Sequence, residues 1–113
     1  MSTDLVSVPP SATVAEAATV MSTHQVGAAL VLEGDRLVGV FTERDILRAL
    51  GSDFDAAGHR VSDWMTRDPL TASPDVDTSE ALATMLGHGF RHLPIVEGDA
   101  AVGIVSMRDV MPR

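Results

Sequence analysis

The strongest constraint on this chain is an internal repeat of 64 residues. When the sequence is shifted by 64 positions, Asp4 falls on Asp68 and Asp45 falls on Asp109, with no gap between them. Thirteen of the 42 overlaid pairs are identical, against roughly two or three expected from average composition. Self-similarity at a fixed offset indicates two copies of one supersecondary unit.

Each copy begins with a predicted short strand and a helix. The strands are the apolar runs 5–8 and 70–72, each followed by a proline-containing turn. Thr13 precedes Glu16 by three residues, and Asp77 precedes Glu80 by three, which is the spacing of a helix N-cap with a reciprocating glutamate. The apolar residues behind these caps recur at helical spacing: Val14, Ala17, Ala18 and Met21 in the first copy, and Ala81, Leu82, Met85 and Leu86 in the second.

A predicted β-hairpin and a further helix complete each copy. The apolar runs 28–32 and 37–41 are separated by Glu33-Gly34-Asp35, and the runs 93–96 and 102–105 repeat that hairpin. Thr42 and Ser106 each open the last helix of their copy, and in the first copy we expect Ile46, Leu47 and Leu50 on its inner side.

The predicted fold class is therefore α/β (α+β), with two tandem β-α-β-β-α repeats. We expect the first repeat at residues 1–50, a connector at 51–65, and the second repeat at 66–113.

Composition excludes several functions. The chain of 113 residues has no cysteine, so disulfides and thiolate metal sites are ruled out. Its net charge of −8 disfavours nucleic acid, and its apolar stretches are far shorter than the ~20 residues of a membrane span. The histidines lack the spacing of metal ligands, and no nucleophile-elbow, P-loop or G-x-G-x-x-G string occurs. We expect a soluble cytoplasmic protein without enzymatic activity or an intrinsic metal.

Four strings point to a known family. "VGVFTERDIL" and "VGIVSMRDVM" close the two copies, while "VSDWMTRDPLTASPD" and "RHLPIVEGD" lie in the second. Together they resemble the cystathionine-β-synthase (CBS) domain pair, also called a Bateman module. The resemblance implies one compact module in which the two repeats are related by pseudo-two-fold symmetry.

The same resemblance implies a regulatory role. Such pairs bind adenosine-containing ligands (AMP, ADP, ATP or S-adenosylmethionine) in clefts between the copies and pass that occupancy to a partner. The resemblance also implies a homodimer, and an effector that is either a separate protein or a further domain. A bound nucleotide could bring Mg²⁺ with it.

Two segments match the family's ribose-and-phosphate motif, namely Thr42-x-x-Asp45 and Ser106-x-x-Asp109. A hydroxyl and free N–H groups at a helix start suit a phosphate, while a carboxylate one turn away can accept both hydrogen bonds of a ribose diol. The alternative interpretation is structural: Thr and Ser are only N-caps, and the aspartates only favour the helix dipole.

The first strand of each copy flanks the purine in this family, which points to Ser7 and Val8 and to Thr71 and Ala72. A base held between aliphatic side chains cannot be told by sequence from an ordinary core strand, so both interpretations stay open.

The two predicted sites differ in charge. Arg91 and His92 begin the second hairpin, where family members place cations near phosphate, whereas the first copy has Gly27 and Ala28 there. We therefore predict one stronger site for a phosphorylated ligand and one site that is weaker, empty or selective for something else. Arg44 and Arg108, beside the aspartates, could face phosphate or only solvent.

One alternative function remains open from the sequence. The chain could be a protein-interaction or dimerisation module whose ligand clefts are degenerate. Paired apolar helical faces can bind a partner whether or not a ligand is bound.

Overall fold

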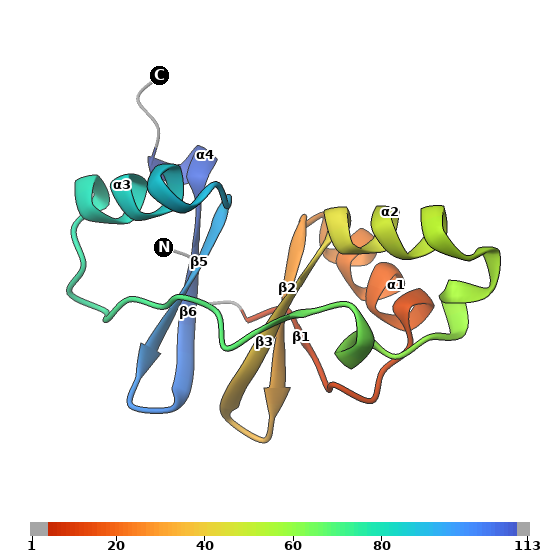
Figure 1. Cartoon of the computed structure of the whole chain (residues 1–113). Helices are drawn as coiled ribbons and strands as arrows, with labels where there is room; N and C mark the ends of the chain where they lie inside the picture. The colour runs from red at the N-terminus through yellow and green to blue at the C-terminus, as the bar shows by residue number, and fades with distance from the viewer. Residues whose placement is uncertain (1–4, 111–113) are drawn as a thin grey trace. The chain divides into compact units, whose positions relative to one another are not determined.

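The computed structural model describes residues 5–110, and these fall into two compact units. Residues Val6–Pro69 form one unit, and the described residues from Leu70 onward belong to the other. The units correspond to the two sequence copies, and each is described by itself below (Figure 1).

The first unit contains the complete β-α-β-β-α succession and the connector that follows it. Its main elements are β1 (Ser7–Val8), α1 (Val14–His24), β2 (Ala28–Glu33), β3 (Arg36–Thr42) and α2 (Glu43–Ser52). The connector adds the short 3-10 helices η1 (Phe54–Gly58) and η2 (Val61–Asp63), and the strand β4 (Thr66–Arg67).

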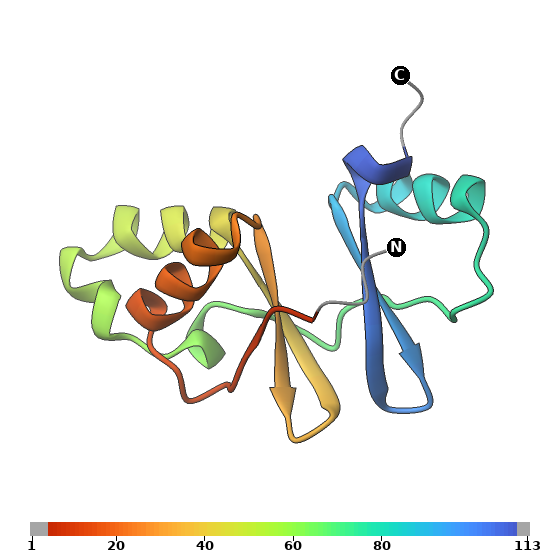
Figure 2. The ribbon, with the colours of Figure 1, turned by 180° about the vertical axis from the view of Figure 1, so that it is seen from behind.

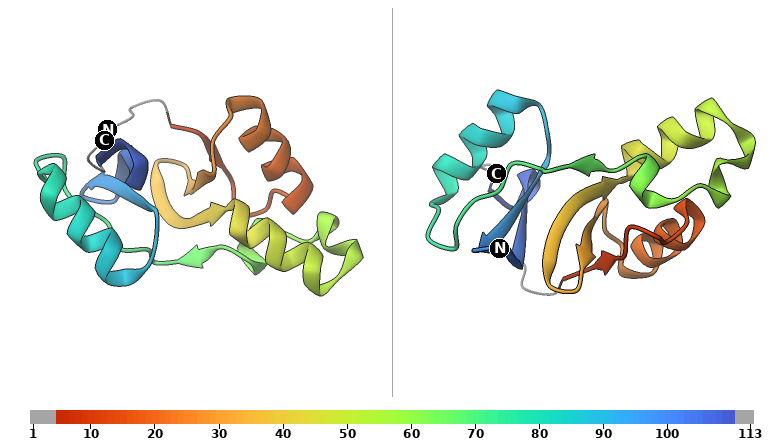
Figure 3. Two further views of the ribbon diagram at one scale, coloured as in Figure 1. Left: turned by 90° about the horizontal axis from the view of Figure 1, so that it is seen from above. Right: turned by 60° about the horizontal axis from the view of Figure 1, so that its bottom comes forward.

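These strands form a small mixed sheet. β1 pairs parallel with β2, which pairs antiparallel with β3. β4 pairs antiparallel with β3, opposite Gly39 and Val40 (Figure 3). α1 connects β1 with β2, as a parallel strand pair requires a crossover (Figure 2).

The core of the first unit lies between α1, the hairpin and the connector. α1 contributes Val14, Ala17 and Met21, and its N-cap Thr13 has both bonds of a capping box with Glu16. Ala56 of η1 and Val61 of η2 are fully buried in the same cluster. The expected connector is thus an integral part of this core.

The second unit repeats the pattern with shorter elements. Its elements are α3 (Thr78–His88), β5 (His92–Glu97), β6 (Ala100–Ser106) and α4 (Met107–Val110). α3 and α4 both lie at the end of the β5–β6 hairpin opposite its turn (Figure 1). The predicted strand 70–72 is reduced to one parallel bridge between Ala72 and Ile95. The core consists of Ala81, Met85, Leu93, Ile95 and Val105.

The hairpins repeat residue by residue. Ala28 pairs with Thr42 in the first copy, and His92 pairs with Ser106, 64 positions later, in the second. The register shift after Val31 recurs after Ile95. Both turns place glycine, Gly34 and Gly98, at a φ of 62°, where a side chain would be strained. The predicted repeat is therefore confirmed at the level of strand register.

Three local predictions were wrong. Leu47 and Leu50 are 73% and 41% exposed, because α2 buries the face of Asp45 and Ala49 instead. Leu86 on α3 is likewise exposed. At Asp77 the side chain accepts from the Glu80 N–H. The reciprocal bond from the Asp77 amide would bring the Glu80 carboxylate close to the Asp77 carboxylate, whose charge already raises the pKa of Glu80.

None of the helices between residues 5 and 110 is long and apolar enough to cross a membrane.

Candidate functional site

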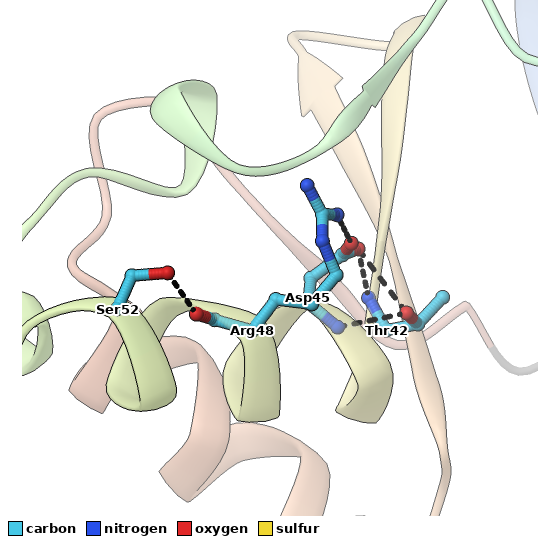
Figure 4. Close-up of polar contacts among 4 residues, drawn as sticks. All are labelled: Thr42, Asp45, Arg48 and Ser52. Carbon is cyan, nitrogen blue, oxygen red and sulfur yellow. Dashed lines mark hydrogen bonds and ion pairs between the residues drawn. The ribbon is translucent and has the colours of Figure 1, made fainter.

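The first Thr-x-x-Asp motif forms a reciprocal capping box at the start of α2. The Thr42 amide donates to Asp45 Oδ2 at 2.9 Å, and the Thr42 hydroxyl donates to the same oxygen at 3.1 Å. The Asp45 amide donates to Thr42 Oγ1 at 3.3 Å. Figure 4 shows this set of bonds at the first turn. The structural interpretation of Thr42 as an N-cap is confirmed, and the ligand role stays a prediction.

Asp45 is 4% exposed, and it is the one charged residue that is buried among residues 5–110. Its second oxygen, Oδ1, accepts from Nη1 of Arg48 at 2.9 Å, one turn further along α2 (Figure 4). The Arg48 carbonyl in turn accepts from the Ser52 hydroxyl at 2.8 Å. A buried carboxylate needs such a partner, because burial penalises its charge.

Arg48 also contacts the connector. Its guanidinium carbon lies 5.7 Å from the centroid of the Trp64 ring, within cation–π range. Trp64 Nε1 donates to Nδ1 of His59 at 3.3 Å, and the two rings stack with an interplanar angle of 13°. Nε2 of His59 lies 3.5 Å from Asp53 Oδ2. One chain of contacts thus runs from Asp45 through Arg48 and Trp64 to the connector.

The second motif has similar bonds in a more open setting. The Ser106 hydroxyl donates to Asp109 Oδ2 at 2.8 Å, and the Ser106 amide donates to the same oxygen at 3.4 Å. The hydroxyl bond is the main reason why the pKa of Asp109 is lowered from its ordinary value of 3.8. Asp109 is exposed, whereas Asp45 is buried.

The residues before the hairpins are tied to the helix starts in both copies. The Glu43 amide donates to the Gly27 carbonyl at 3.0 Å, and the Met107 amide donates to the Arg91 carbonyl at 2.7 Å. The Glu43 carboxylate oxygen Oε1 lies 3.3 Å from where a β-carbon on Gly27 would stand. The first site is therefore flanked by an acidic side chain, where the second has Arg91 and Met107.

The other predicted residues lie as follows. On the first strand of each copy, Val8 is buried, Ala72 is half-buried, and Ser7 and Thr71 are exposed. Arg91 is exposed immediately before β5, and His92 is the half-buried first residue of that strand. Arg44 and Arg108 are both exposed, on the first turns of α2 and α4.

Sequence reasoning missed Arg48 and Trp64. The signal for Arg48 was its position three residues after Asp45 on a helix, which places the two side chains on one face. No sequence signal connected Trp64 to Asp45, because that contact depends on how the connector folds back.

A sequence model of the CBS domain matches residues 1–52 and again residues 61–112. The chain therefore belongs to the CBS domain family and carries two tandem copies of the domain.

Curated relatives place this pair in longer proteins. The chain is 42% identical over 106 residues to an uncharacterized 17.7 kDa protein of Acidianus ambivalens, covering 91% of this chain and 63% of that protein. It is 35% identical over 112 residues to the inosine-5′-monophosphate dehydrogenase of Methanocaldococcus jannaschii, covering 97% of this chain but 22% of that enzyme.

Solved structures agree on the fold. The CBS-domain protein ATU1752 of Agrobacterium tumefaciens matches with a TM-score of 0.87 and 33% identity, over 95% of this chain and 86% of that one. The CBS domain pair of protein MJ0100, solved with 5′-methylthioadenosine and S-adenosyl-L-methionine, matches with a TM-score of 0.90 and 24% identity, over 97% and 87% of the two chains.

Proposed function

We propose that this protein is a regulatory module that binds an adenosine-containing ligand and passes its occupancy to a partner. The ligand is AMP, ADP, ATP or S-adenosylmethionine, with Mg²⁺ arriving only on a nucleotide. The protein itself carries out no catalysis. The single observation that carries the proposal is the hydroxyl–carboxylate pair that recurs at residues 42 and 45 and at residues 106 and 109.

The chemistry of these pairs suits a nucleotide. A carboxylate can accept two hydrogen bonds from a ribose diol, and the hydroxyl beside it can donate to a phosphate oxygen. The first turn of α2 adds N–H groups and the positive end of a helix dipole. We assign the purine to the strand residues that precede these motifs: Ser7 and Val8 in the first copy and Thr71 and Ala72 in the second.

The second copy is the better phosphate site in this proposal. Arg91 and His92 bring cationic or donor groups near its helix start, whereas Arg108 beside Asp109 is matched by Arg44 beside Asp45 and does not distinguish the copies. In the first copy the corresponding positions hold Gly27 and Ala28, and Glu43 adds a negative charge. A phosphate dianion is repelled by that carboxylate, so the first site favours a ligand or ligand portion without phosphate.

The comparisons support two parts of the proposal, the ligand class and the regulatory role. The MJ0100 pair shows that this fold accommodates adenosyl ligands. The dehydrogenase relative shows that a similar pair occurs within a larger enzyme, as expected of a module that acts on something else. We propose accordingly that residues 1–50 and 66–113 act as two repeats joined by the connector at 51–65, and that the effector is a separate protein or another domain.

A second candidate is a protein-interaction or dimerisation module with degenerate ligand sites. It is favoured by three exposed apolar side chains on α2 and η1: Leu47, Leu50 and Phe54, which is 98% exposed. A homodimer is compatible with both functions, because a sensor can also assemble through such a surface.

A thermal-shift screen against AMP, ADP, ATP with Mg²⁺ and S-adenosylmethionine separates the two candidates. A sensor gains stability from one of them, about 2.7 kcal/mol at a hundredfold excess over the dissociation constant. Asp109→Ala should reduce that gain to what the first site supplies, whereas Asp99→Ala, which removes an exposed aspartate from the hairpin turn, should leave it unchanged. A flat response from folded protein favours the interaction module.

A further inference from the structure

The carboxylate of Asp45 already has two partners inside the first unit. Oδ2 accepts from the amide and the hydroxyl of Thr42, and Oδ1 accepts from Arg48 at 2.9 Å. The Asp45 side chain is 6% exposed and that of Arg48 is 58% exposed, so Arg48 is the outer member of the ion pair. A diol that bonds both carboxylate oxygens must compete with Arg48 at Oδ1.

Arg48 is also anchored at its far side. Its guanidinium lies 5.7 Å from the Trp64 ring centroid, and Trp64 is fixed by its Nε1–H bond and its stacking on His59. An arginine that pairs with a carboxylate and lies over an aromatic ring loses two favourable contacts when it leaves.

The second copy has a different residue at the position equivalent to Arg48. The residue 64 positions after Arg48 is Pro112, whose side chain carries no charge. Asp109 is exposed and takes its two described bonds from Ser106. Within residues 5–110, the Asp45 carboxylate is thus the one motif carboxylate that is paired with an arginine.

We propose that Arg48 is a specificity-determining residue of the first copy: it occupies the Asp45 carboxylate without ligand, lowers the affinity of that site for a diol, and leaves Trp64 when a ligand takes Asp45. This inference rests on the proposed function. It also gives the connector a means of sensing the first site, because displacing Arg48 removes its contact with Trp64.

The test uses Arg48→Met, which removes the cation, keeps an unbranched stem and preserves helix propensity. The matched control is Arg36→Met, which makes the same substitution in the first copy at an exposed arginine where β3 begins. Both variants are made with Asp109→Ala, so that calorimetric titration with AMP, and in parallel with S-adenosylmethionine, reports on the first copy.

We expect Arg48→Met to tighten binding about tenfold relative to Asp109→Ala alone, since an ion pair and a cation–π contact no longer compete. Arg36→Met should leave the affinity unchanged, and adding Asp45→Ala should abolish the gain. Unchanged or weaker binding by folded Arg48→Met would overturn the inference. If that variant fails to fold, Arg48→Gln, neutral and of similar shape, must show the same gain.

A measurement without ligand checks the contact itself. Trp64 is the one tryptophan of the chain, so its emission is free of other tryptophan signals. Its emission should change in Arg48→Met and not in Arg36→Met, and identical spectra would contradict the arrangement.

Failure of the inference and failure of the proposed function differ in outcome. If the wild-type chain binds either ligand through Asp109 but Arg48→Met brings no gain at Asp45, only the role of Arg48 is wrong. If neither ligand binds to the wild type or to any variant, the adenosyl-sensor function is wrong and the role of Arg48 falls with it.

Discussion

The amide nitrogen of Met107 lies 2.7 Å from the carbonyl oxygen of Arg91, which ties the first turn of α4 to the residue before β5. The same bond joins Glu43 and Gly27 in the first copy at 3.0 Å. The same backbone bond is thus flanked by the cation of Arg91 in the second copy and by the carboxylate of Glu43 in the first. This difference underlies the expectation that the two sites prefer different ligands.

The first prediction concerns Arg91. Arg91→Ala should weaken AMP binding about tenfold, or about 1.4 kcal/mol, because a charge-assisted bond to phosphate is lost. Adenosine, which has no phosphate, should bind the variant and the wild type alike. Arg36→Ala, at an exposed arginine where β3 begins, is the calorimetric control. Equal losses for AMP and adenosine would show that Arg91 does not contact phosphate.

The second prediction concerns the pH response of Asp109. Its pKa is lowered below 3.8, chiefly by the Ser106 hydroxyl. The stabilisation from the charged carboxylate is therefore present above the unfolded-state pKa and is lost as the pH falls through the lower folded-state value. A carbon-13 NMR titration of the carboxyl groups should show that Ser106→Ala raises the pKa of Asp109 toward 3.8.

Ser73→Ala is the matched control for that titration. The Ser73 hydroxyl bonds to Asp75 and is the largest cause of the lowered pKa of that group. The substitution should raise the pKa of Asp75 and leave that of Asp109 where it was. A response of Asp109 to Ser73→Ala, or none to Ser106→Ala, would contradict the assigned bonds.

The third prediction concerns Gly39 and the connector. A β-carbon at Gly39 would lie 2.6 Å from Sδ of Met65 and 2.8 Å from the carbonyl oxygen of Thr66. Gly39→Ala should therefore displace β4 from β3 and reduce the free energy of unfolding by about 1–3 kcal/mol. Urea unfolding measures the change.

An alanine at Gly51 is expected to raise the free energy of unfolding instead. It lies within α2 and its β-carbon would meet nothing within 4 Å. Gly51→Ala should stabilise the protein by up to about 1 kcal/mol, because glycine is unfavourable inside a helix. If both alanine variants unfold at the same urea concentration as the wild type, β4 does not pack against Gly39 as described.

The fourth prediction concerns self-association. If the exposed side chains of Leu47 and Phe54 mediate a homodimer, Leu47→Glu with Phe54→Glu should convert it to a monomer by burying charge at the contact. Light scattering coupled to size exclusion measures the mass. Arg36→Glu, which makes the same change of charge at an exposed residue of the hairpin, is the control. A Leu47→Glu, Phe54→Glu variant that stays dimeric would place the interface elsewhere.

Much of the fold could be predicted because an element found in one copy is expected at the same position of the other. The Thr13 cap and both hairpins follow from turn and cap chemistry that acts within a few residues. Which face of α2 is buried could not be predicted in this way. Leu47 and Leu50 are as apolar as Ile46, but of the three only Ile46 packs against the core, on the side of the helix where Asp45 and Ala49 are buried.

The candidate site was predictable only in part. Local spacing identified the bonds between Thr42 and Asp45 and between Ser106 and Asp109. Local spacing says nothing about the contact of Arg48 with Trp64, because these residues meet only when the connector folds onto the first unit.

The central claim is that a nucleotide binds at the paired hydroxyl and carboxylate groups. Titration of nitrogen-15-labelled protein with AMP, followed by amide NMR shifts, tests it most directly. We predict that the amides of Ser106 to Asp109 and of Thr71 and Ala72 shift first, and that those of Thr42 to Asp45 follow at higher AMP. Shifts confined to the hairpin turns at Gly34 and Gly98, or no shifts at millimolar AMP, would contradict the claim.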